Sequence, residues 1–225
     1  MSEIIGLASV NVGVPTVLSA TADPPVWSGM RKSPVEAGTA LWLSLVNLSG
    51  DGQADLSVHG GPDKAVYAYP SEHLEPWSSE LGTTVHDLGP APFGENLSTI
   101  GVTEADVCIG DRWSWGDAVL EICQPRWPCF KLTLHRGRSD IAQLMLRSGR
   151  TGWYLRVIEP GEVRASEDPE VIYRHPAGLS VLDAHLAKGD RRLEDRDRVS
   201  ALAAHDRLAD QWRYSLVERL QRHEA

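Results

Sequence analysis

One cysteine in the run Gln124–Lys131 has neighbours of the types that activate a thiol. Cys129 follows directly after Pro128, which stiffens the backbone ahead of it. Arg126 and Lys131 stand on either side of this cysteine. A thiol acts as a nucleophile or a metal ligand in its thiolate form, which nearby cations stabilise. The run therefore predicts a functional thiol, and the alternative is a buried cysteine that serves only as a small apolar side chain.

A second segment, Gly50–Ala65, is dense in turn-forming and charged residues. His59 precedes Gly60 and Gly61, which permit a positive φ and close approach of the backbone to a ligand. Successive backbone N–H groups in such a turn can bind an anion, and Lys64 adds a cation nearby. The segment predicts an anion site, and the alternative is a hairpin turn with a surface histidine.

A third segment with polar residues is Phe93–Leu97. Glu95 and Asn96 follow Gly94 and precede a strand-like segment, where they could orient a ligand or simply cap a turn. Two motifs of hydrolases are absent from the sequence, which has neither an HExxH zinc motif nor a GxSxG nucleophile elbow.

Composition limits the class of protein. The 225 residues are 42% hydrophobic and 24% charged, which predicts a packed globular core. The net charge of −9 disfavours general nucleic-acid binding, because an acidic surface repels phosphate backbones. The three cysteines form no CxxC pair, and their odd number favours a reducing, cytoplasmic compartment. The chain has neither a basic secretory leader nor an apolar run of about 20 residues, so we expect no membrane association.

The first two thirds of the chain have the pattern of a β protein. Gly- and Pro-rich turns separate short apolar or alternating runs, which predicts a barrel or a curled sandwich with an opening strand near Ile4–Val12. The other predicted strands are 41–46, 66–69, 112–115, 119–122 and 153–158. Two helices are expected between them, over 71–81 and 139–148, with Ser71 and Ser139 as N-caps and Gly149 as the stop.

The last fifty residues differ in kind. Leu208, Trp212, Leu216 and Leu220 recur every four residues, which is typical of an amphipathic helix. Two shorter helices are expected over 180–188 and 198–206. The sequence therefore predicts a β domain over residues 1–170 and a three-helix domain over residues 171–225.

Three of these segments, taken in order, resemble a known family. The runs Gly50–Tyr69, Phe93–Leu97 and Arg126–Leu132 are similar to those of the MOSC domain, and the helical tail resembles that of its YiiM-like branch. The resemblance covers nearly the whole chain. It implies a mainly β fold with helices: a MOSC-type β-barrel followed by a small C-terminal three-helix domain.

The resemblance also implies a cofactor and a set of roles. Members of the family hold the molybdenum cofactor (molybdopterin) in a cleft, and Cys129 stands at the position of the metal ligand. His59 or Glu95 would supply the proton for catalysis. Pyridoxal phosphate is not expected. The residues expected to hold the cofactor are Lys32, Gly60, Gly61, Lys64, Asn96, Arg126 and Lys131.

The activity implied is reduction of small N-hydroxylated compounds, such as hydroxylamino purine bases. A separate flavin or iron–sulfur reductase would be the partner that supplies electrons. Two alternatives remain open: a sulfur carrier with a persulfide on Cys129, and a non-catalytic binding module. Trp127 departs from the small residue that many relatives carry beside the cysteine, and we expect its ring to reshape the pocket.

Overall fold

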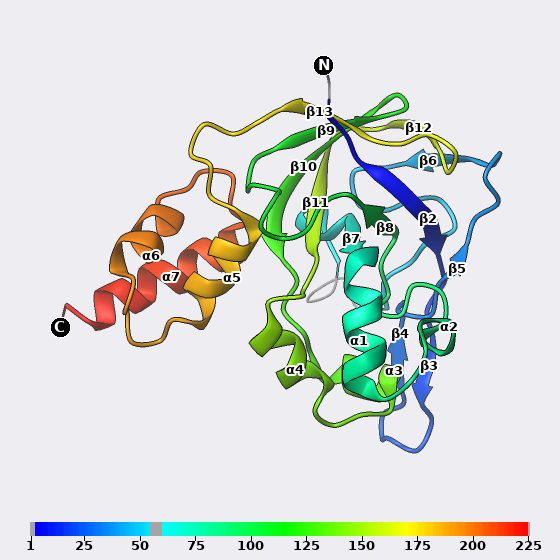
Figure 1. Ribbon diagram of the computed structural model, residues 1–225, viewed down its shortest axis with the longest axis horizontal. Coiled ribbons are helices and arrows are strands. Elements are labelled where there is room, and N and C mark those ends of the chain that lie inside the picture. The colour runs from blue at the N-terminus through cyan, green and yellow to red at the C-terminus, as the bar shows by residue number, and fades with distance from the viewer. Residues whose placement is uncertain (1–2, 55–59, 225) are drawn as a thin grey trace.

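The centre of the protein is a nine-stranded sheet, seen in a computed structural model that describes residues 3–54 and 60–224. In spatial order its strands are β1 (Glu3–Ile4), β13 (Glu170–Tyr173), β9 (Arg112–Trp115), β10 (Ala118–Pro125), β11 (Trp153–Glu159), β7 (Val66–Pro70), β8 (Leu97–Ile100), β2 (Gly6–Val12) and β5 (Ser33–Pro34). Neighbouring strands pair antiparallel, except that β7 and β8 run parallel. The strands curl into a half-barrel (Figure 1), which confirms the predicted class of fold.

Two smaller antiparallel pairs complete the β structure. They are β12 (Gly161–Arg164) with β6 (Ala40–Leu43), and β3 (Thr16–Ser19) with β4 (Val26–Ser28). The predicted strand over 41–46 is too long, because the chain turns after Leu43. The Ser44 hydroxyl donates to the Asn47 carbonyl at 2.9 Å and closes that turn.

Seven α-helices occur in the part of the chain that the structure describes. They are α1 (Leu74–Leu81), α2 (Val85–Leu88), α3 (Phe130–Arg136), α4 (Ile141–Ser148), α5 (Val181–Gly189), α6 (Arg196–Ala203) and α7 (Asp210–Arg222). Two single 3-10 turns, η1 (Pro62–Lys64) and η2 (Ser71–His73), precede them. In Figure 1 the helices α1–α4 lie in the lower half of the view, beside β3 and β4, and α5–α7 form a separate group at the left. Within the described ranges, no helix combines the length and apolar character needed to cross a bilayer.

The first two predicted helices are present, but both of the N-caps predicted from the sequence are wrong. The 3-10 turn η2 begins at Ser71, and the N-cap of α1 is His73. The N-cap of α4 is Asp140 rather than Ser139. In both places the chain leaves the preceding segment through a tighter turn before the regular α-helical bonds begin. Gly149 ends α4 at φ 73°, as predicted.

The tail contains the three predicted helices. Helix α5 begins with a capping box, in which Ser180 and Asp183 each accept a backbone N–H of the other. Helix α6 lies earlier than predicted, because Asp195 caps it and starts it at Arg196. Leu208 precedes α7 and is buried like Trp212 and Leu216 of the predicted stripe, whereas Leu220 near the end of the helix is only partly buried.

The tail shares one continuous hydrophobic core with the sheet. Residues of α5, α6 and α7 belong to the same buried cluster as residues of β9, β10 and β11, among them Leu120, Ile122, Trp153, Val181, Leu202, Trp212 and Leu216. Arg219 of α7 also donates to the carbonyls of Ala187, Lys188 and Asp190 at the end of α5. The last strand of the sheet runs to Tyr173, across the predicted division at residue 170, and that division stays a prediction.

Candidate functional site

Cys129 stands directly before α3, a helix that was not predicted from the sequence. The strand β10 ends at Pro125, and the N–H of Arg126 donates to the Gly152 carbonyl at 3.1 Å. This bond holds the segment ahead of the cysteine against the residues that lead into β11. The signals that flank α3 are Pro128 before it and Gly137, at φ 66°, after it. Its seven residues are too few for a clear apolar period, which is why the helix was missed.

Six of the predicted site residues line one cleft. They come from separate parts of the chain and meet where β10 ends: Lys32, Lys64, Asn96, Arg126, Cys129 and Lys131. The cleft encloses about 670 Å³, its open mouth included, which is within the usual range for small-molecule sites. The folded chain therefore brings the thiol and the basic residues of the sequence motifs to one place.

The cleft is basic although the chain as a whole is acidic. Lys32, Lys64, Arg126 and Lys131 all line it, and Asp51 is the one acid among its described lining residues. Lys131 and Arg126 are both less than one tenth exposed. Cations held in a partly desolvated cleft attract anions more strongly than cations on an open surface do. The cleft is therefore suited to an anionic ligand.

A buried ion pair forms one wall of the cleft. Lys32 donates to the Asp51 carboxylate, and their side chains are 6% and 2% exposed. Burial lowers the pKa of Lys32 from its ordinary value, and the attraction of Asp51 opposes that shift. The other Asp51 oxygen accepts from the Asn96 amide at 3.0 Å. Asn96 in turn accepts from the N–H of Tyr67 at 3.1 Å, so this residue also ties the wall to β7.

Another part of the cleft wall is built on Tyr67, a residue that the sequence marked only as part of a strand. The guanidinium of Arg126 lies 4.9 Å from the centre of the Tyr67 ring and donates to its hydroxyl at 3.2 Å. The hydroxyl donates to the Thr151 carbonyl at 2.8 Å. Burial raises the pKa of Tyr67, so its phenol stays protonated. These contacts fix the direction of Arg126 at the edge of the cleft.

Glu95 lies behind the cleft rather than on its surface. Its side chain is buried and is not among the lining residues, although its neighbours Gly94 and Asn96 are. The carboxyl accepts from the N–H of Phe93 at 3.0 Å and from the Ser98 hydroxyl at 3.4 Å. Burial raises the pKa of Glu95 to about 7, which allows this carboxyl to exchange a proton near neutral pH.

The predicted anion turn is only partly described. His59 lies outside the described residues. Gly61 has a φ of 92° and accepts the N–H of Lys64 at 3.0 Å, which closes the 3-10 turn η1. Gly60 and Gly61 do not line the cleft, whereas Lys64 does.

Trp127 connects the cysteine segment to the helical tail. Its ring centre is 5.8 Å from that of His185 in α5 and 5.8 Å from that of Trp212 in α7. The indole is 39% exposed and also lines the cleft. The predicted effect of Trp127 on the pocket thus has a structural basis, because its ring stands between the cleft and the tail.

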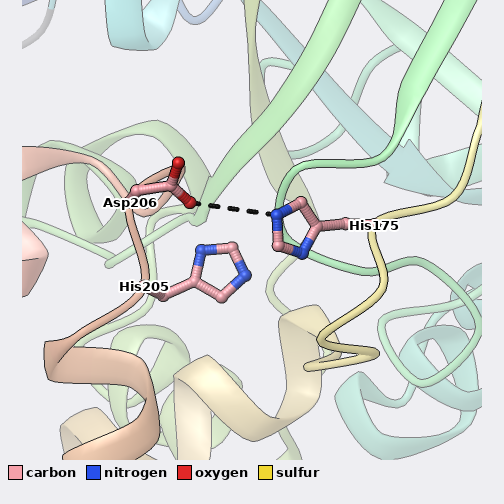
Figure 2. A group of neighbouring side chains, drawn as sticks. All are labelled: His175, His205 and Asp206. Atoms are coloured by element: carbon pink, nitrogen blue, oxygen red, sulfur yellow. Dashed lines mark ion pairs between the residues drawn. The ribbon is translucent and has the colours of Figure 1, made fainter.

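A second group of polar side chains lies outside the cleft. His175 follows β13, and His205 and Asp206 lie in the turn between α6 and α7 (Figure 2). The Nδ1 atoms of the two rings accept the N–H groups of Ala177 and Arg207, at 3.3 and 3.2 Å. Each neutral ring then carries its proton on Nε2, which leaves no lone pair for a metal ion. The group instead packs the turn before α7 against the segment after β13: the His175 and His205 ring centres are 4.5 Å apart, and His175 Nε2 lies 3.8 Å from an Asp206 oxygen.

Known proteins are similar to this chain in sequence and in architecture. The MOSC domain family matches residues 55–168. YflK of Bacillus subtilis, described as uncharacterized, is 38% identical over 225 residues, which cover 98% of this chain and 96% of that protein. YiiM of Escherichia coli is 38% identical over 185 residues, 82% of each chain. A Gibberella moniliformis protein named "Reductase" is 34% identical over 146 residues, 64% of this chain and 26% of that one.

The solved structure of Escherichia coli YiiM has the same fold. It superposes with a TM-score of 0.76 at 32% identity, over 99% of this chain and 94% of that one. The agreement extends through the helical tail as well as the sheet, because nearly all of both chains is matched. The chain therefore belongs to the MOSC-domain family, and its relatives and its architecture place it in the YiiM-like branch.

Proposed function

We propose that this protein is a molybdenum-cofactor-dependent reductase of N-hydroxylated compounds. One observation carries the proposal: Cys129 shares a cleft with four cationic side chains. A soft thiolate is a suitable ligand for a heavy transition metal, and the cations are suited to the phosphate and dithiolene groups of an anionic cofactor. The reductase named among the relatives is in keeping with redox chemistry.

The residues of the cleft fit the cofactor by the chemistry of their donor groups. Cys129 would ligate the metal, and Arg126, Lys131, Lys64 and Lys32 would hold the anionic parts. Arg126 is already oriented by Tyr67, so its fork of N–H groups needs little reordering to bind a phosphate. When bound, the cofactor would supply the two-electron redox chemistry, and the protein would hold it and exclude competing ligands.

The reaction also requires protons. Reduction of an N–OH group takes up two electrons and two protons, replaces the N–O bond with an N–H bond and releases water. Glu95 holds a proton near neutral pH and lies directly behind the cleft wall, so we assign it the role of proton reserve. We also propose that a separate flavin or iron–sulfur reductase delivers the electrons.

Metal analysis of matched cysteine variants tests the proposal. The wild type and the Cys129→Ala, Cys129→Ser and Cys108→Ala variants would be produced together with the cofactor and analysed for molybdenum. We expect the wild type and the Cys108→Ala control to bind molybdenum and reduce an N-hydroxylated probe with a chemical electron donor. Loss of the metal ligand should lower occupancy by at least about tenfold in both Cys129 variants.

Two results would overturn the proposal. Unchanged molybdenum content and activity in Cys129→Ala would remove the thiol from the site. A wild-type protein that binds no molybdenum but carries an extra sulfur on Cys129, seen by mass spectrometry, would instead establish the persulfide carrier.

A further inference from the structure

A second cavity lies on the other side of Cys129, between the end of β10 and the helical tail. The cysteine segment contributes Gln124, Trp127 and Cys129 to its lining. The tail contributes Lys188 from α5, and Gln211 and Trp212 from α7. With its open mouth it encloses about 740 Å³, which is enough for a small molecule.

The two cavities meet at Cys129. Four residues line both of them, and these are Lys64, Trp127, Cys129 and Tyr154. A cofactor attached to Cys129 would occupy the basic cleft. The second cavity would then stay open, and a small molecule could reach the cofactor through it from the side of the tail.

The lining of the second cavity differs from that of the basic cleft. Its apolar walls are the indoles of Trp127 and Trp212, which meet edge to face at 5.8 Å. Flat aromatic walls of this kind favour flat aromatic ligands. None of its described lining residues is acidic, and both Lys64 and Lys188 line it. A ligand with hydrogen-bond acceptors is therefore favoured over a cation.

The polar groups of the cavity are held in place by their own contacts. The Gln124 amide donates to the Asp63 carbonyl at 2.9 Å, which fixes the orientation of that side chain. Lys188 donates to the Ser215 hydroxyl at 2.6 Å, and its Nζ lies 5.1 Å from the centre of the Trp212 ring. Gln211 is exposed at the start of α7, where its amide can pair with the edge of a ligand.

We propose that this cavity is the substrate site, and that Gln211 and Lys188 of the tail determine specificity for planar aromatic N-hydroxylated compounds without a positive charge. This inference rests on the proposed reductase function and assigns the helical tail a part in it. The basic cleft would hold the cofactor, and the tail would select what reaches Cys129.

Binding to the full chain without cofactor tests the site directly. The probes are benzhydroxamic acid, which has an aromatic ring, and acetohydroxamic acid, which has the same N-hydroxy group without the ring. By isothermal titration calorimetry we expect the aromatic probe to bind at least about tenfold more tightly. Gln211→Ala and Lys188→Met should each weaken its binding by about three- to tenfold. Gln221→Ala is the matched control, because Gln221 is also an exposed glutamine of α7 but does not line the cavity.

Kinetics of the molybdenum-loaded protein provide a second readout. The Gln211→Ala variant should have a raised KM for benzhydroxamic acid and an unchanged kcat, because it loses binding rather than chemistry. Equal affinity of both probes, or wild-type affinity in both tail variants, would overturn the inference even in a protein that binds molybdenum. If the protein shows the predicted binding pattern but takes up no molybdenum when it is produced together with the cofactor, the reductase function is refuted and the ligand site is retained.

Discussion

The indole of Trp127 packs edge to face on the indole of Trp212, with the two ring centres 5.8 Å apart. Trp127 precedes Cys129 by two residues, and Trp212 lies in the last helix of the tail. The tail therefore helps to set the position of the thiol segment, and we expect a substitution in either one to alter the stability of the other.

Replacing the Trp127 ring should loosen the tail. Trp127→Leu removes the aromatic contacts with Trp212 and His185, which should lower the free energy of unfolding by about 1 kcal/mol beyond the apolar area lost. Urea denaturation measures the change, and amide hydrogen exchange should increase in α7. The control is Trp42→Leu, whose indole is 56% exposed on β6. Equal effects of the two substitutions would show that the aromatic contact does not stabilise the tail.

Removing Asp51 should destabilise the protein strongly. Asp51→Ala leaves the buried Lys32 ammonium without its carboxylate and the Asn96 amide without one acceptor. Breaking a buried pair in this way costs about 3–5 kcal/mol. The measurement is the urea midpoint at pH 7.

The double variant Lys32→Met/Asp51→Ala separates charge from packing. It removes the unpaired charge and keeps an apolar chain of similar length, so it should recover a large part of the lost stability. If it is no more stable than Asp51→Ala alone, the loss comes from packing or from the other Asp51 bonds.

His135 should make the protein sensitive to acid. Burial, together with the positive charge of Arg136 and Arg126, lowers the pKa of His135 from 6.5 to about 4. A lowered pKa in the folded state means that the unfolded chain binds the proton more tightly, so stability is full above pH 6.5 and is lost as the pH falls toward 4. The contribution is at most about 3 kcal/mol. His135→Gln should flatten this decline in urea titrations between pH 7 and 4, whereas His86→Gln, at a 98% exposed side chain, should not.

The contribution of Glu95 to stability should change with pH in the opposite direction to that of His135. Burial raises its pKa to about 7, so the folded state holds the proton more tightly than the unfolded chain does. That contribution is full below pH 4.5 and is lost as the pH rises through 7. Glu95→Gln keeps the side chain neutral, so its stability relative to the wild type should improve by up to about 3 kcal/mol between pH 4.5 and 8. Glu218→Gln, on the exposed face of α7, is the control. A constant difference across this range would show that Glu95 is not held protonated.

Local signals were enough to predict much of the fold. The four-residue spacing of Leu208, Trp212 and Leu216 predicted the helix α7, because that period repeats on one face of an α-helix whatever it packs against. Gly149 likewise marked a real helix end, since a glycine C-cap depends on residues within one turn, whereas the predicted N-caps Ser71 and Ser139 were wrong. The start of α1 and the whole of α3 were not predictable in this way, because short helices and tight turns carry weak periodic signals.

The sequence by itself determined the kind of chemistry: a thiol between cations, motifs in the order of the MOSC family, and a helical tail. Only the tertiary structure decided which of these residues meet. It placed Lys32, Asp51 and Asn96 in one network, moved Glu95 behind the cleft wall, and packed Trp127 on Trp212. The physical reason is that composition and local spacing act over a few residues, whereas a cleft is made by strand pairing and burial between segments far apart in the chain.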